Sequence, residues 1–347
     1  MCPVHQLSSY CRWLDASYDN QYGPCLMLRH PQLLPTLQKS QTLRKLSIQF
    51  ASQCLEEDAE PDNAFVSLKG FSNLTSLELY GFYGDDAQLV KEISSILKNL
   101  PTLKMLGLGM AYLCDPSGSS EVLILNGDPN FLENICLEYH SRRGSSPLAL
   151  DTLRLGHGMF FYKSEPTSTD NFLAKMVKVE GLKTFHIWNG WVRFTEDEDE
   201  DALPWKLDFT LLKGCETLRQ LSVTRLSSEV RKWLNGPGRS VEELTVTDHY
   251  SMYDETLYNF NLLKLPHLTM LFTREVTVQA RGGESEWSDI DSSDSDTDCF
   301  FSTLYSNPLS EKNLNRATIT VLDRLYDNGS QLSRLGICFD FEAHWVS

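Results

Sequence analysis

The chain has 347 residues, 41% of them hydrophobic, which is enough to bury a large core. Its formal charge is −16, and no basic patch with interleaved aromatic residues stands out against this acidity, so we expect no nucleic-acid partner. No apolar run approaches the ~18 residues of a membrane span and residues 1–6 carry no secretory signal, so we expect a cytoplasmic or nuclear protein without membrane contact.

A short pattern repeats along most of the chain. Residues 1–29 precede its first copy, and we expect them to form an N-terminal cap. From residue 43 on, Leu-x-x-Leu-x-Leu recurs nine times with small variations, mostly at spacings typical of repeat proteins. The copies start at Leu43, Leu74, Leu103, Leu150, Leu182, Leu218, Val241, Leu268 and Leu332.

Each copy has the pattern of a short buried strand. Its last two apolar residues are two positions apart, so they point to the same face of a strand and can be buried there. Parallel strands need a long crossover, and the intervals 87–99, 130–142 and 171–179 have the periodicity of amphipathic helices. No unit can bury its apolar face alone, so the sequence predicts stacked strand–helix units with one continuous core.

These units resemble leucine-rich repeats over roughly residues 30–347. The resemblance implies one α/β solenoid domain, with a curved parallel sheet on its concave face and helices on its convex face. Leucine-rich repeats commonly carry Asn or Cys at the ninth place of the unit, and this chain does not. The uneven spacing and this departure resemble the irregular repeats of F-box-type proteins. In the first seven copies the residues at that place are Ala51, Phe82, Ala111, Gly158, Gly190, Leu226 and His249.

Residues 28–46 resemble the start of the repeats that follows the F-box in fungal-type F-box proteins. The resemblance implies that the repeats hold a target protein for ubiquitination, while an F-box binds a Skp-type adaptor and a cullin. Residues 1–29 are shorter than an F-box and lack its Leu-Pro signature. Either the gene model begins late, or the chain is a paralogue that keeps target binding and has lost the ligase connection.

We expect the residues between the strand leucines to line the concave face. Nine strands at about 4.8 Å spacing give a face about 38 Å long, which suits a folded protein or an extended peptide. Because no cofactor or metal motif is present, binding is the expected use. The residues predicted to contact a partner are Lys45, Ser47, Glu78, Tyr80, Met105, Arg154, His186, Trp188, Gln220, Glu243, Phe272 and Arg334.

The segment after Trp188 adds three further candidates, Trp191, Arg193 and Phe194, which we expect on the following loop. Exposed Trp and Arg are enriched at the residues that dominate interface energies, so a partner-binding role is one interpretation. The other is that these aromatic side chains pack on neighbouring units and shield the core.

The acidity is concentrated in two segments, which we expect to be mobile insertions at 195–203 and 281–299. Thirteen of the 47 acidic residues lie there with one basic residue, Arg281, and the rest of the chain carries 34 acidic and 30 basic residues. Ser288, Ser293 and Ser295 are each followed three places later by an acidic residue, which resembles the site of kinases of the casein kinase 2 type. A phosphorylated docking strip and a plain solvated loop are both open interpretations.

An alternative function is therefore a stand-alone scaffold or regulator, which binds a basic partner through its acidic loops and is a monomer outside its complexes. We expect no enzymatic activity, because the common catalytic motifs are missing from the sequence. The sequence contains no Gly-rich phosphate loop, no H-E-x-x-H and no Gly-x-Ser-x-Gly. Its nine cysteines are scattered singly, so we predict no disulfide framework and no zinc site.

Overall fold

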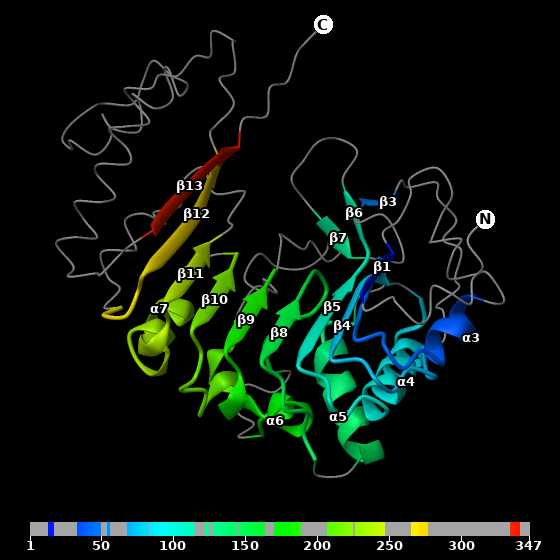
Figure 1. Ribbon diagram of the computed structural model, residues 1–347. Coiled ribbons are helices and arrows are strands. Elements are labelled where there is room, and N and C mark those ends of the chain that lie inside the picture. The colour runs from blue at the N-terminus through cyan, green and yellow to red at the C-terminus, as the bar shows by residue number, and fades with distance from the viewer. Residues whose placement is uncertain are drawn as a thin grey trace, which may run out of the picture.

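Ten strands lie side by side in a parallel sheet, in the order in which they occur along the chain (Figure 1). They are β1 (Trp13–Ala16), β2 (Lys45–Gln49), β4 (Ser76–Phe82), β5 (Met105–Met110), β8 (Thr152–Leu155), β9 (Thr184–Ile187), β10 (Gln220–Val223), β11 (Glu243–Val246), β12 (Met270–Val276) and β13 (Arg334–Asp340). The computed structural model describes residues 13–16, 33–49, 54–55, 68–82, 84–114, 122–124, 128–143, 146–163, 170–188, 207–224, 226–246, 265–276 and 334–340.

Each of the nine copies of the repeated pattern forms one strand of this sheet. The copies pair in register: Leu46 lies opposite Leu77, which lies opposite Leu106. The predicted parallel sheet is thus confirmed, in an α/β solenoid-like arrangement. β1 was not predicted; it lies within the expected N-terminal cap and continues the sheet, with Trp13 opposite Lys45.

The helices lie along the outer side of the arc that the strands form (Figure 1). The predicted helices 87–99 and 130–142 are confirmed to within one residue, whereas the predicted helix 171–179 is shorter than expected. Side-chain caps fix three of the starts: Asp85 accepts from the Gln88 N–H, Asn171 from the Ala174 N–H and Ser227 from the Val230 N–H. The helices are α3 (Leu33–Gln38), α4 (Asp86–Lys98), α5 (Phe131–Arg143), α6 (Phe172–Met176) and α7 (Ser228–Leu234), with short 3-10 turns η1 (Val179–Gly181), η2 (Phe209–Leu212) and η3 (Pro237–Ser240).

A second, three-stranded sheet explains the longest interval in the first half of the chain. It contains β3 (Cys54–Leu55), β6 (Tyr112–Cys114) and β7 (Val122–Ile124), and β6 pairs with β7 in antiparallel fashion. Between the copies that start at Leu103 and Leu150, the chain thus inserts β6 and β7 before it forms α5. Sequence periodicity did not predict this sheet.

The core is continuous from α3 to the start of β12. The first residue of every copy up to Leu268 is at most 2% exposed, and the other leucines of the pattern pack beside it. At β9 a phenylalanine replaces the central leucine of the pattern. Phe185 packs against Phe161 with ring centroids 4.9 Å apart, and an aromatic cluster continues through Phe209 to Trp233.

Polar bonds at the strand starts join successive units. The carbonyl of the second residue of a copy accepts two N–H groups from the next unit; for example, Arg219 O accepts from Glu242 N and Glu243 N. A hydroxyl directly before the copy adds a side-chain bond: Thr217 Oγ1 lies 2.9 Å from Leu182 O, and Ser240 Oγ lies 3.0 Å from Leu218 O. These contacts join each unit to the unit before it.

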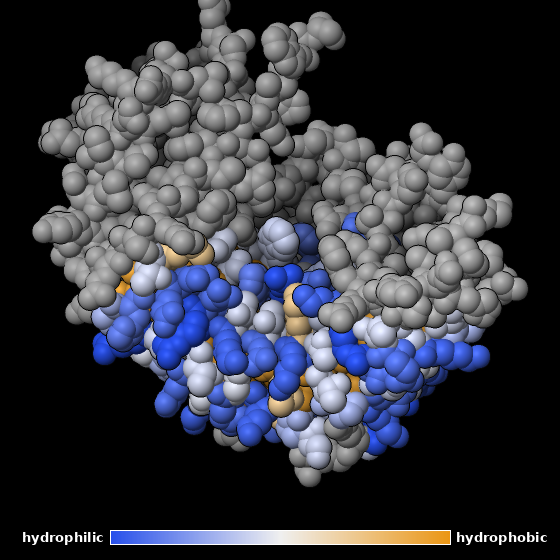
Figure 2. All heavy atoms as spheres, viewed as in Figure 1, coloured by the Kyte–Doolittle hydropathy of each residue, from blue (hydrophilic) through white to orange (hydrophobic). Residues whose placement is uncertain are grey.

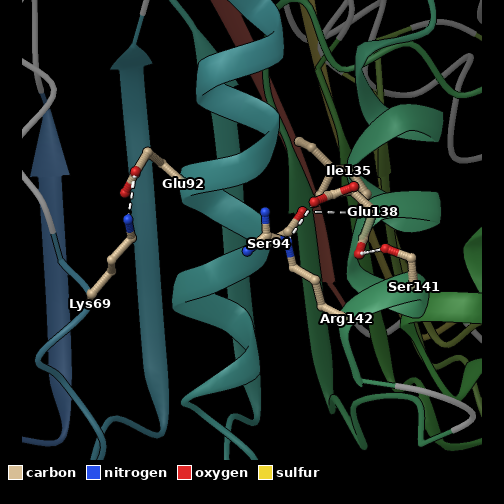
Figure 3. A network of polar contacts seen from close by, with 7 residues as sticks. All are labelled: Lys69, Glu92, Ser94, Ile135, Glu138, Ser141 and Arg142. Atoms are coloured by element: carbon tan, nitrogen blue, oxygen red, sulfur yellow. Dashed lines mark hydrogen bonds and ion pairs between the residues drawn. The ribbon is translucent and has the colours of Figure 1, made fainter.

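The outer helices also contact one another directly. Figure 3 shows the buried Ser94 of α4 donating to the Ile135 carbonyl of α5 at 3.3 Å, and an ion pair between Glu138 and Arg142 along α5. Among the described helices, none is long and apolar enough to cross a bilayer.

Candidate functional site

The face of the sheet opposite the helices presents the residues that alternate with the buried leucines. We call it the concave face. Lys45 is exposed, while the predicted residues from Ser47 to Gln220 and Glu243 that lie within the strands are half-buried. Trp188 directly follows β9 and its side chain is exposed. The half-buried set is Ser47, Glu78, Tyr80, Met105, Arg154, His186, Gln220 and Glu243.

Several predicted site residues cannot be placed in this way. Phe272 and Arg334 belong to β12 and β13, but their side chains lie outside the described part. The loop candidates, the three serines and both acidic insertions, 195–203 and 281–299, lie outside the described residues altogether. The residues concerned are Trp191, Arg193, Phe194, Ser288, Ser293 and Ser295.

The register places one charged row across the middle of the concave face. Glu78 of β4 lies opposite Gly107 of β5, Gly107 opposite Arg154 of β8, and Arg154 opposite His186 of β9. Because Gly107 has no side chain, its two neighbours meet above it. Arg154 Nη1 lies 2.8 Å from Glu78 Oε1, so an ion pair joins strands that are not adjacent.

Glycines of β5 also make room for an aromatic ring. A Cβ on Gly107 would lie 2.5 Å from Tyr80 Oη, and one on Gly109 would lie 2.9 Å from Tyr80 Cδ1. The Tyr80 ring therefore lies across β5, and its hydroxyl reaches Glu78 Oε1 at 3.4 Å. Burial, reinforced by Glu78, raises the pKa of Tyr80, so its hydroxyl stays protonated as a donor.

His186 lies beside this ion pair and is held neutral. Burial lowers its pKa to about 4, and the positive charge of Arg154 acts in the same direction. At neutral pH the imidazole therefore offers one donor and one acceptor nitrogen to a partner. Glu78 therefore binds both Arg154 and Tyr80, and the opposite charges of Glu78 and Arg154 cancel. Tyr80 and His186 add no charge to this cluster at neutral pH.

A second polar row runs along the starts of the later strands. Thr184 of β9 donates to Gln220 Oε1 of β10 at 2.9 Å, and Gln220 Nε2 donates to Glu243 Oε2 of β11 at 2.7 Å. These bonds orient three half-buried side chains before any partner arrives. Such an ordered polar surface loses less side-chain entropy on binding than a free one.

Trp188 contrasts with its surroundings because it is apolar and open. Its backbone N–H donates to Leu155 O at 2.7 Å, which continues the β9 pairing, yet its side chain is 53% exposed. Figure 2 shows that most of the described surface that faces the viewer is hydrophilic, with small hydrophobic spots. A partner that covers Trp188 would therefore remove the exposed apolar surface of its indole from water.

Sequence reasoning missed two features of this site. The sequence predicted that Glu78, Tyr80 and Arg154 lie on the concave face, but it did not predict that these side chains meet above β5. It also did not show that Gly107 and Gly109 provide the space in which they meet. The available signal was Gly at successive face positions of one strand, which leaves space above it.

The described residues hold no cluster of His, Cys, Asp and Glu arranged for a metal ion. Burial raises the pKa of Cys136 and raises that of Cys215 to about 11, so both thiols are protonated at neutral pH. The concave face therefore offers hydrogen bonds and apolar contact to a partner.

No protein-family model matches the chain, and no curated protein matches it.

Proposed function

We propose that this chain is an irregular leucine-rich-repeat protein whose concave face binds another protein. The observation that carries the proposal is the contiguous face itself. Parallel strands follow one another in chain order, and the nine strands from β2 to β13 span about 38 Å at the usual strand spacing. A surface of this extent matches a folded domain or an extended peptide better than a small metabolite.

The middle of this face has the chemistry of an interface centre. Trp188 is exposed, while Tyr80 and Arg154 are held in place by the Glu78 carboxylate and by the glycines of β5. Trp, Tyr and Arg are the residue types that contribute most to interface free energies. A partner that covers this region would bury preorganised side chains and gain affinity accordingly.

We further propose that the bound protein is a target for ubiquitination. This part rests on the resemblance of residues 28–46 to the start of the repeats in F-box proteins, a stretch that contains α3. A Skp-type adaptor and a cullin would then join through an F-box. The chain tagged at its C-terminus and purified from its own cells should carry both proteins; their absence would leave a stand-alone binding module.

Site-specific photo-crosslinking tests the binding face directly. A benzophenone side chain in place of Ser222, which is half-buried on the concave face, should crosslink a companion protein in cells. The control places the same group at Lys91, an exposed position on the helical side. Crosslinks of the same companion at Lys91 alone, or at neither position, would contradict binding through the concave face.

A further inference from the structure

The turns that lead into β2, β4 and β5 form a second, differently charged surface. Residues 39–44, 68–75 and 98–104 contain five basic residues and no acidic one, although the whole chain carries −16. All five are exposed and the three strands are neighbours in the sheet. We call this surface the basic edge; it consists of Lys39, Arg44, Lys69, Lys98 and Lys104.

Most of this charge is not compensated. Lys69 Nζ pairs with Glu92 of α4 at 2.7 Å, as Figure 3 shows. Within the described residues, none of the other four makes an ion pair with a carboxylate. Arg44 donates to the Gln41 carbonyl and Lys104 to the Ala149 carbonyl, contacts that orient the side chains and leave their charges in place.

The corresponding turns of the later units differ. Acidic residues accompany the basic ones there, and two of them form ion pairs: Lys183 with Asp151 at 3.0 Å and Arg219 with Glu242 at 3.4 Å. The turns before β9 and β10 also carry Glu180 and Glu216. The turns before β9 and β10 therefore combine basic with acidic residues, whereas the first three turns carry basic residues alone.

We propose that the basic edge is a second docking surface, separate from the concave face, and that it binds an acidic segment of a partner protein. Its charges are presented on adjacent strands about 4.8 Å apart, and an extended segment presents side chains of one face about 7 Å apart, so several contacts can form at once. The exposed hydroxyl of Ser72 supplies a further donor for a carboxylate, while Asn73 and Thr102 donate to Gln41 Oε1 and Leu74 O within the fold.

An acidic protein segment fits this edge better than a nucleic acid does. The aromatic residue of these turns, Phe71, is 2% exposed, so the described edge offers no platform on which a base could stack. The net charge of the chain also repels a long polyanion. A short acidic segment senses mainly the local positive charge, because salt screens the rest beyond about 8 Å.

The test measures binding of a fluorescein-labelled glutamate-rich peptide to the full chain by anisotropy. The triple variant Lys39→Gln, Lys98→Gln and Lys104→Gln removes three charges from the edge and leaves the bridging Arg44 intact. The matched control, Lys178→Gln, Lys213→Gln and Lys232→Gln, removes the same charge from exposed lysines elsewhere. Thermal unfolding of each variant verifies that both remain folded.

We expect the edge variant to bind the peptide about tenfold more weakly than the unmodified chain, the control to change little, and the affinity to fall as salt rises. Equal losses in both variants, or no loss in either, would overturn the proposal. A single-stranded oligonucleotide of equal charge that binds as tightly would assign the edge to nucleic acid instead. Self-association that the edge variant abolishes would assign it to a second copy of the chain.

Discussion

Glu78 and Arg154 form an ion pair across an intervening strand, with Arg154 Nη1 2.8 Å from Glu78 Oε1 above Gly107 of β5. The pair joins β4 to β8 on the concave face, and the Tyr80 ring lies beside it over the same strand. A missing side chain at one position of β5 therefore determines how three neighbouring side chains are arranged.

Gly107→Ala tests this arrangement. The added Cβ would lie 2.5 Å from Tyr80 Oη and 3.0 Å from Glu78 Cγ, so the ring must move. We expect a loss of about 1–3 kcal/mol in the free energy of unfolding, measured with denaturant. In a Tyr80→Ala background the same substitution should cost clearly less, because the obstructing ring is gone. Equal losses in both backgrounds would show that Tyr80 does not occupy this space.

The strands and two of the helices were predictable from sequence because they depend on local periodicity. Leu46, Leu77 and Leu106 recur at fixed places in the pattern, and burial of their common face requires the parallel pairing that the structure shows. The second sheet was not predictable, since β3 and β6 are only two and three residues long and pair across a separation of more than fifty residues. Such pairing leaves too little periodicity to detect.

Phe185→Leu restores the leucine that other copies carry at this place, and we expect it to destabilise the chain. Phe185 lies 4.9 Å from the Phe161 ring and 6.4 Å from the Phe209 ring, centroid to centroid, so leucine leaves a cavity between them. The expected loss is about 1–2 kcal/mol in denaturant unfolding. A gain in stability, as a consensus argument would suggest, would contradict the observed packing.

Thr217→Val tests the hydroxyl contacts that join the units. Its Oγ1 lies 2.7 Å from Glu180 O and 2.9 Å from Leu182 O, and valine keeps the shape while it removes the donor. We expect a loss of about 0.5–1 kcal/mol in the free energy of unfolding. Thr245→Val, at a half-buried position on the concave face, is the matched control. The prediction is wrong if the two substitutions cost the same.

The site itself was predictable only in outline. Alternation along β9 predicts His186 and Trp188 on the concave face, and in the structure His186 lies opposite Arg154 while Trp188 is exposed directly after the strand. The ion pair above Gly107 depends on the lateral order of β4, β5 and β8, and the chain inserts β6, β7 and α5 between β5 and β8. Which residues become lateral neighbours thus depends on which strands pair, and the local sequence does not contain that information.

His186 gives a pH prediction. Its folded-state pKa of about 4 lies below the ordinary value of 6.5, because burial and then Arg154 disfavour the charged imidazole. The unfolded chain therefore binds the proton more readily, and stability falls as the pH drops from 6.5 toward 4. His186→Gln should remove this part of the pH dependence, as unfolding measured across that range would show. An NMR titration of the imidazole near pH 6.5 would contradict the assignment.

Trp188→Ala tests the central claim, that the concave face binds a protein. Leu137→Ala is the control, because Leu137 is the other large hydrophobic residue exposed within the described part and lies on α5, on the helical side. Both variants should unfold within about 0.5 kcal/mol of the unmodified chain, since neither side chain is buried.

The decisive measurement is the affinity of each variant for the companion protein that copurifies with the chain. A loss of about thirtyfold for Trp188→Ala, with Leu137→Ala unchanged, is the result that the concave face predicts. Equal recovery of the companion by both variants, and release of it by salt alone, would contradict this account and place the partner on a charged surface of the chain instead.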